Sequence, residues 1–162
     1  MKILGHRHTG ILTHDLDRMI AFYTGLGFVL KRRDLEKGHF LENLLNSEGI
    51  ILETAKLIIE NDDVPIKYLY VLELMTLNHD YNVVNDNKME KKPCFDFKNR
   101  ATGFLDIAFT VDDINAVCQY VLSQGGDLIG DPLESVGGYP ALHCYLRDPE
   151  GNVLHIAENL PI

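Results

Sequence analysis

Apolar residues recur with the period of an α-helix in two stretches of the chain. An acidic residue stands immediately before each stretch, Asp15 before the first and Asp113 before the second, where a helix N-cap belongs. The apolar positions lie on one helical face in each case, at Leu16, Met19, Ile20 and Tyr23, and then at Ile114, Val117, Cys118 and Val121. The pattern therefore predicts two amphipathic helices of the same design.

Short apolar runs typical of β-strands surround each predicted helix. The runs that lead into the helices, 8–15 and 106–113, align position by position. Further strands are predicted at 29–35, 50–59 and 68–75 after the first helix, and at 127–130, 141–146 and 152–157 after the second. Each half follows the order β-α-β-β-β, so we predict an α+β fold built from one repeated module.

The repeat also sets the expected domain organisation. We predict a first module at 1–78, a linker at 79–102 that is poor in periodic apolar residues, and a second module at 103–162, which together make one domain. Segment 38–49 is predicted to be an inserted loop or short helix that docks through Phe40, Leu44 and Leu45. Pro and Gly at 148–152 predict a tight turn into the last strand.

Charge narrows the range of partners. The formal net charge is -9, from 24 acidic and 15 basic residues, which argues against nucleic acid or an anionic membrane as partner. That leaves a small molecule or another protein as the partner, and we expect a small-molecule substrate. The sequence has neither a membrane-spanning apolar run nor a leader, so we expect a cytoplasmic protein. The cysteines Cys94, Cys118 and Cys144 are too far apart to predict a disulfide framework or a cysteine zinc site.

Four side chains at equivalent positions of the two modules could coordinate a metal ion. His8 and Asp106 open the two first strands, while Glu73 and His155 lie in the middle of the two last strands. Two imidazoles and two carboxylates form a mixed nitrogen and oxygen donor set that suits Zn, Ni, Co, Mn or Fe. On the strand before the last, His143 and Tyr145 share one face, and we consider both substrate contact and ordinary packing for them.

Three segments resemble signatures of a known family. HTGILTHDLDRMIAFYTGLGF resembles the opening signature of the vicinal oxygen chelate superfamily, the glyoxalase I, bleomycin resistance and extradiol dioxygenase fold. GFLDIAFTVDDINAV and YLRDPEGNVLHIAE resemble its second-half signature. The resemblance implies a cup-shaped mixed sheet around a divalent metal ion. It also implies a homodimer, because family members pair such modules within a chain or between chains.

The resemblance assigns the metal to His8, Glu73, Asp106 and His155. The first two are the usual residues, whereas glyoxalase I and methylmalonyl-CoA epimerase typically carry His at the third position and Glu at the fourth. This chain transposes that pair, with Asp106 third and His155 fourth. The usual catalytic base is the Glu at the fourth position, so its role is expected to move to Glu73, which occupies the equivalent last strand of the first module.

The resemblance implies a metal-dependent lyase or isomerase of glyoxalase I or epimerase type, acting through a metal-stabilised enediolate on a small oxygenated substrate. Two alternatives remain. The first is an Fe(II) extradiol-type dioxygenase, for which His8, Asp106 and His155 would supply two His and one carboxylate. The second is a non-catalytic small-molecule binder like the bleomycin resistance proteins, which lack a metal site.

Overall fold

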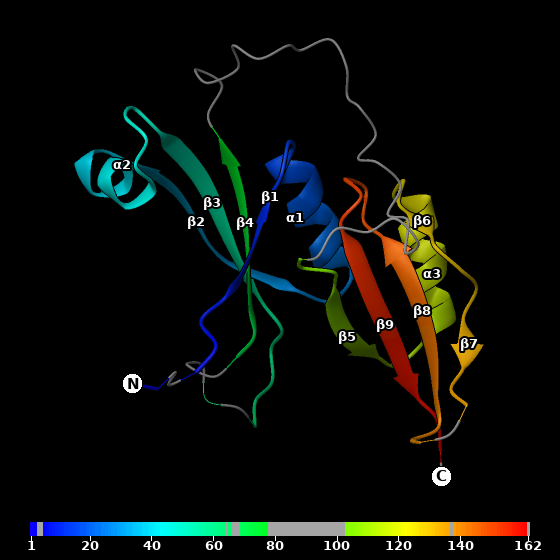
Figure 1. The fold of residues 1–162 in the computed structure, drawn as a ribbon. Coiled ribbons are helices and arrows are strands. Elements are labelled where there is room, and N and C mark those ends of the chain that lie inside the picture. Colours follow the sequence, from blue (N-terminus) through cyan, green and yellow to red (C-terminus); the bar gives the residue numbers. More distant parts are fainter. Residues whose placement is uncertain (3–4, 64, 66–68, 78–102, 137, 162) are drawn as a thin grey trace. The chain divides into compact units, whose positions relative to one another are not determined.

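The computed structural model describes residues 1–2, 5–63, 65, 69–77, 103–136 and 138–161. The chain divides into two compact units, Met1–Lys88 and Met89–Ile162, and each is described by itself (Figure 1). The predicted linker at 79–102 and Cys94 lie outside the described residues. Within the described part of the chain, no helix is both long and apolar enough to cross a bilayer.

The first unit is a four-stranded sheet with two helices. Strand order is β1-β4-β3-β2, with β1 parallel to β4 and the other neighbours antiparallel. The elements are β1 (Thr9–Leu12), α1 (Leu16–Gly25), β2 (Val29–Lys37), α2 (His39–Leu45), β3 (Ile51–Ile58) and β4 (Val71–Leu77).

The second unit repeats this plan with a five-stranded sheet. Its path is β5-β9-β8-β6, with β5 parallel to β9, and β7 also pairs with β8, near the start of that strand. The elements are β5 (Ile107–Val111), α3 (Ile114–Ser123), β6 (Asp127–Leu128), β7 (Leu133–Glu134), β8 (Ala141–Arg147) and β9 (Val153–Asn159). The expected mixed α+β fold is confirmed, with one sheet in each unit.

Both predicted helices are present and begin at the predicted caps. The Asp15 carboxylate accepts a hydrogen bond from the Arg18 backbone N–H at 3.0 Å, and Asp113 accepts one from the Ala116 N–H at 2.9 Å. Such caps satisfy backbone donors that the first helical turn leaves unpaired. Each helix buries its apolar face, with Met19 and Tyr23 of α1 fully buried. Helices α1 and α3 therefore each cover one face of their own sheet.

The internal repeat extends to the register of the strands. Gly10 of β1 is opposite Glu73 of β4, and Ala108 of β5 is opposite His155 of β9. On the other side of these last strands, Lys56 of β3 is opposite Glu73 and Tyr145 of β8 is opposite His155. Glu73 and His155 therefore occupy structurally equivalent places in the two units.

Segment 38–49 shows where the sequence-based expectation was wrong. A short helix, α2, forms there, but Phe40, Leu44 and Leu45 are 80%, 65% and 45% exposed and do not dock it. Leu41 docks the helix instead, in a buried cluster with Ile50 and Leu52 of the adjoining strand segment. Only the face that includes Leu41 turns toward the sheet.

Two small differences concern the second unit. The strand predicted at 127–130 is limited to Asp127–Leu128, and the two-residue strand β7 (Leu133–Glu134) was not predicted. A segment of two residues is too short to show an alternating pattern. Its place in the sheet comes only from pairing with β8.

The predicted turn before β9 forms around one buried carboxylate. The Asp148 side chain is 2% exposed and accepts hydrogen bonds from the backbone N–H groups of Glu150 and Asn152, at 3.0 and 2.9 Å. Gly151 adopts φ 85°, a left-handed conformation that favours glycine. The turn sets where β9 begins, and thereby the position of His155 on that strand.

Candidate metal and catalytic site

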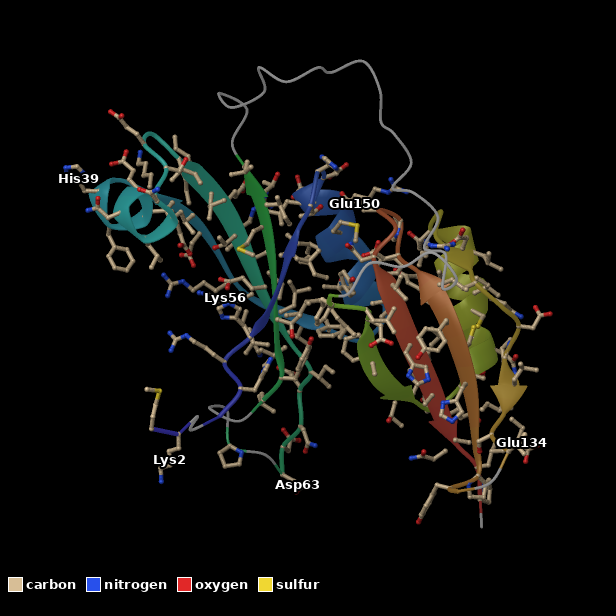
Figure 2. All side chains as sticks on the ribbon, in the orientation of Figure 1. Lys2, His39, Lys56, Asp63, Glu134 and Glu150 are labelled. Carbon is tan, nitrogen blue, oxygen red and sulfur yellow. The ribbon has the colours of Figure 1, made fainter. Side chains whose placement is uncertain are left out.

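One face of the first sheet carries the candidate residues of the first unit. Leu72 and Leu74 are fully buried, on the face that α1 covers. Because successive side chains of a strand alternate, Glu73 points to the opposite face. Lys56, labelled on its strand in Figure 2, is directly opposite Glu73 and shares that face. We call this surface, defined by Glu73, Lys56 and their in-register neighbours, the site face.

The Glu73 carboxylate has a partner on each oxygen. Its Oε2 lies 3.2 Å from Nε2 of His8, and its Oε1 lies 3.1 Å from Nζ of Lys56. The Glu73 side chain is only 8% exposed, whereas His8 and Lys56 are 39% and 38% exposed. Burial of a carboxylate is costly without such partners. The pairing therefore explains how an acidic side chain is accommodated in the middle of the sheet.

Lys56 was not among the site residues predicted from the sequence. It lies in a segment that was predicted as a strand, but strand prediction alone does not say which residue of the neighbouring strand it faces. The missing information was the β3–β4 register, which places Lys56 against Glu73. The internal repeat did contain one signal for Lys56. Lys56 is the structural counterpart of Tyr145, and Tyr145 had been considered as a substrate contact from the sequence.

In the second unit, His155 is enclosed by two side chains of β8. Its Nε2 lies 3.0 Å from Nδ1 of His143, so that one ring can donate a hydrogen bond to the other. The Tyr145 ring stacks on the His155 ring with centroids 4.5 Å apart and planes 9° apart. Burial lowers the pKa of His155 and the neighbouring His143 lowers it further, while Asp106 acts in the opposite direction. The net effect favours the neutral imidazole, which is the form that binds metals.

Asp106 joins the same group through Tyr145. Burial raises the pKa of the Tyr145 phenol, and the Asp106 charge and a hydrogen bond to its carboxylate raise it further. The phenol therefore remains protonated near neutral pH and can donate to Asp106. The structure thus brings together the four residues that were predicted in this half, namely Asp106, His143, Tyr145 and His155.

The arrangement of the candidate ligands can be compared with the coordination that a divalent ion requires. Among the residues that the structure describes, no three His, Cys, Asp or Glu side chains are arranged around one point so as to hold a metal. Each unit nevertheless offers two ligands of suitable type. The 3.2 Å separation of His8 Nε2 and Glu73 Oε2 is close to the spacing of about 3 Å between neighbouring donors bonded at about 2.1 Å to one ion. The separation of His8 and Glu73 therefore fits two neighbouring ligand positions around such an ion.

Comparisons with known proteins agree with this fold. Residues 5–156 match the family model described as Glyoxalase/Bleomycin resistance protein/Dioxygenase superfamily. A glyoxalase family protein from Bacillus cereus is similar in structure, with 22% identity and a TM-score of 0.77 over 99% of this chain and 97% of that chain. A comparison with curated proteins found no match.

Two more solved structures have the same fold. Glyoxalase I from Zea mays has 22% identity and a TM-score of 0.59 over 96% of this chain and 47% of its own, so this chain spans about half of the maize protein. A glyoxalase/bleomycin resistance protein/dioxygenase family enzyme from Burkholderia phytofirmans PsJN has 20% identity and a TM-score of 0.52 over 95% of this chain and 98% of its own. With the family model matching almost the whole sequence, the chain belongs to the Glyoxalase/Bleomycin resistance protein/Dioxygenase superfamily.

Proposed function

We propose that the protein is a divalent-metal-dependent lyase or isomerase of glyoxalase I or epimerase type that acts on a small oxygenated substrate. The observation that supports this most directly is the buried Glu73 carboxylate, with His8 on one oxygen and Lys56 on the other. A carboxylate held next to an imidazole can serve both as a metal ligand and as a base. Proton abstraction next to an oxygen requires both roles.

The residues that would hold the ion are His8, Glu73, Asp106 and His155, drawn from one chain or from two. When bound, a divalent ion acts as a Lewis acid that draws electron density from a substrate oxygen and makes the neighbouring C–H bond more acidic. The mixed nitrogen and oxygen donors suit Zn, Ni, Co, Mn or Fe(II).

Glu73 is the proposed catalytic residue. Its Oε1 would take the proton from the substrate carbon and return it to the carbon that receives it, which is general base and then general acid catalysis. The Lys56 ammonium lies 3.1 Å from the same Oε1 and helps to fix the orientation of the carboxylate. His155, whose Nε2 lies 3.0 Å from His143, and Asp106, which is hydrogen-bonded to Tyr145, are the alternative bases in the second unit.

A metal assay tests the proposal. Protein purified without chelators should contain about one divalent ion per chain by elemental mass spectrometry. His8→Ala and Glu73→Ala should each weaken binding by about 100-fold or more, because each removes a ligand bond. His39→Ala is the matched control, since His39 forms a similar pair with Glu42 at 3.1 Å on α2, well away from Lys56 in Figure 2. Full metal occupancy in both site variants would refute the assignment.

A second candidate function is an Fe(II) dioxygenase. It is favoured by the cluster in which His143 and Tyr145 flank His155, because dioxygenase chemistry needs acid–base groups beside two His ligands and a carboxylate. Iron as the co-purified metal, together with oxygen uptake on addition of a catechol, would favour this reading. A protein that binds small molecules without any metal would instead match the non-catalytic binder.

We further propose that the protein is a homodimer, since similar half-modules in this superfamily pair within or between chains. Sedimentation velocity at micromolar concentration should give the mass of two chains. A profile with the mass of one 18.3 kDa chain would refute the dimer and leave the metal proposal intact.

A further inference from the structure

One row of residues in register crosses the whole first sheet. Gly10 of β1 is opposite Glu73 of β4, Glu73 is opposite Lys56 of β3, and Lys56 is opposite Arg32 of β2. Side chains that are directly opposite on neighbouring strands point to the same face, about 5 Å apart. Lys56 and Arg32 are therefore two cations side by side on the site face, next to the proposed base.

Like charges at directly opposed positions destabilise a sheet unless something balances them. Within the chain, Lys56 is balanced by Glu73, and Arg32 is paired with Asp34 on its own strand. The Lys56 and Arg32 side chains nevertheless remain 38% and 69% exposed. Each can present a cationic group to a ligand that approaches this face.

Two other cations of β2 are engaged elsewhere. Lys31, at a β-bulge between Leu30 and Arg32, pairs with Glu60 at 2.5 Å. Arg33 bonds Asp17 of α1 at 2.6 Å, which places it on the helix-covered face. The chain as a whole carries a net charge of -9, so a cationic pair beside a buried carboxylate is not explained by a general excess of basic residues.

We propose that Lys56 and Arg32 form a subsite for the carboxylate group of the substrate, which makes the substrate a small carboxylic acid oxygenated at the neighbouring carbon. This inference rests on the proposed function. The Lys56 ammonium lies 3.1 Å from Oε1 of Glu73 and its side chain is 38% exposed, so its open side can bind a second anion from solvent. The two oxygens of one carboxylate can then bind the Lys56 ammonium and the Arg32 guanidinium together.

Charge favours a monoanion over a phosphate dianion. Within the first unit, Glu73 and Asp34 already offset the charges of Lys56 and Arg32. A carboxylate adds one negative charge to this balanced group and a phosphate dianion adds two, so the carboxylate meets less repulsion from Glu73 and Asp34.

The test compares lactate with lactamide, its neutral analogue, as probes of the full chain with its bound metal, by NMR titration. Lactate should bind at least about tenfold more tightly than lactamide, a difference that corresponds to roughly 1.4 kcal/mol. Lys56→Met should remove this preference by weakening lactate alone, while Lys56→Arg should retain most of it. Arg32→Leu should weaken lactate binding to a smaller extent.

Lys31→Met is the matched control, because it removes a neighbouring cation that is paired with Glu60. The inference is overturned if lactate fails to bind, if lactate and lactamide bind equally, or if Lys56→Met and Lys31→Met behave alike. Tighter binding of inorganic phosphate than of lactate would also overturn it. Metal content is measured on the same samples, so a metal-free protein that still prefers lactate through Lys56 refutes the proposed function and leaves the anion subsite standing.

Discussion

Replacing Glu73 with glutamine should slow the exchange of solvent protons into the substrate by about 10²- to 10⁴-fold, the usual contribution of a general base. Glutamine has nearly the same shape and keeps a carbonyl oxygen that can remain near His8 or a metal ion. Its amide cannot accept the proton from carbon. Deuterium uptake from D₂O at the reacting carbon, followed by NMR, measures the effect directly.

Glu53→Gln is the control for this variant. Glu53 lies on the same sheet but pairs with Arg33 at 2.7 Å, on the face that carries α1. Its replacement should leave the exchange rate unchanged. If Glu73→Gln keeps its metal and still exchanges protons at the wild-type rate, Glu73 is not the base, and Asp106 or His155 must be tested in its place.

Gly126→Ala should destabilise the second unit by about 3 kcal/mol, at the upper end of the usual cost of overpacking. A Cβ at this position would lie 2.3 Å from the Arg147 carbonyl oxygen and 2.6 Å from Cγ1 of Val121. The carbonyl oxygen belongs to the backbone of β8, so it cannot rotate away. The glycine allows the chain to pass between α3 and the strand that carries His143 and Tyr145.

Urea denaturation followed by circular dichroism measures the loss. The control is Gly130→Ala in the same unit, where an added Cβ meets no atom within 4 Å, and its free energy of unfolding should change by no more than about 0.5 kcal/mol. If both variants unfold at the same urea concentration, the close approach at Gly126 does not constrain the fold.

The parts of this protein that were predictable from sequence depend on local interactions. The two amphipathic helices, their caps at Asp15 and Asp113, and the turn around Asp148 all follow from side chains that contact backbone a few residues away. Strand alternation likewise predicted that Glu73 and His155 point away from their apolar neighbours. The repeated module was visible because both halves use the same local signals.

Other features depend on which strand pairs with which, and in what register. A shift of one residue between two strands would turn every side chain of one of them to the other face, and the local sequence does not specify that choice. Lys56 against Glu73, Arg32 beside Lys56, and His143 on His155 all come from the register of the folded sheets. The docking of α2 through Leu41 depends in the same way on tertiary contact with Ile50 and Leu52. The sequence by itself thus determined the repeated α+β module and its candidate ligands. Tertiary strand pairing decided which charged and aromatic groups surround those ligands, because the groups and the ligands lie far apart along the chain.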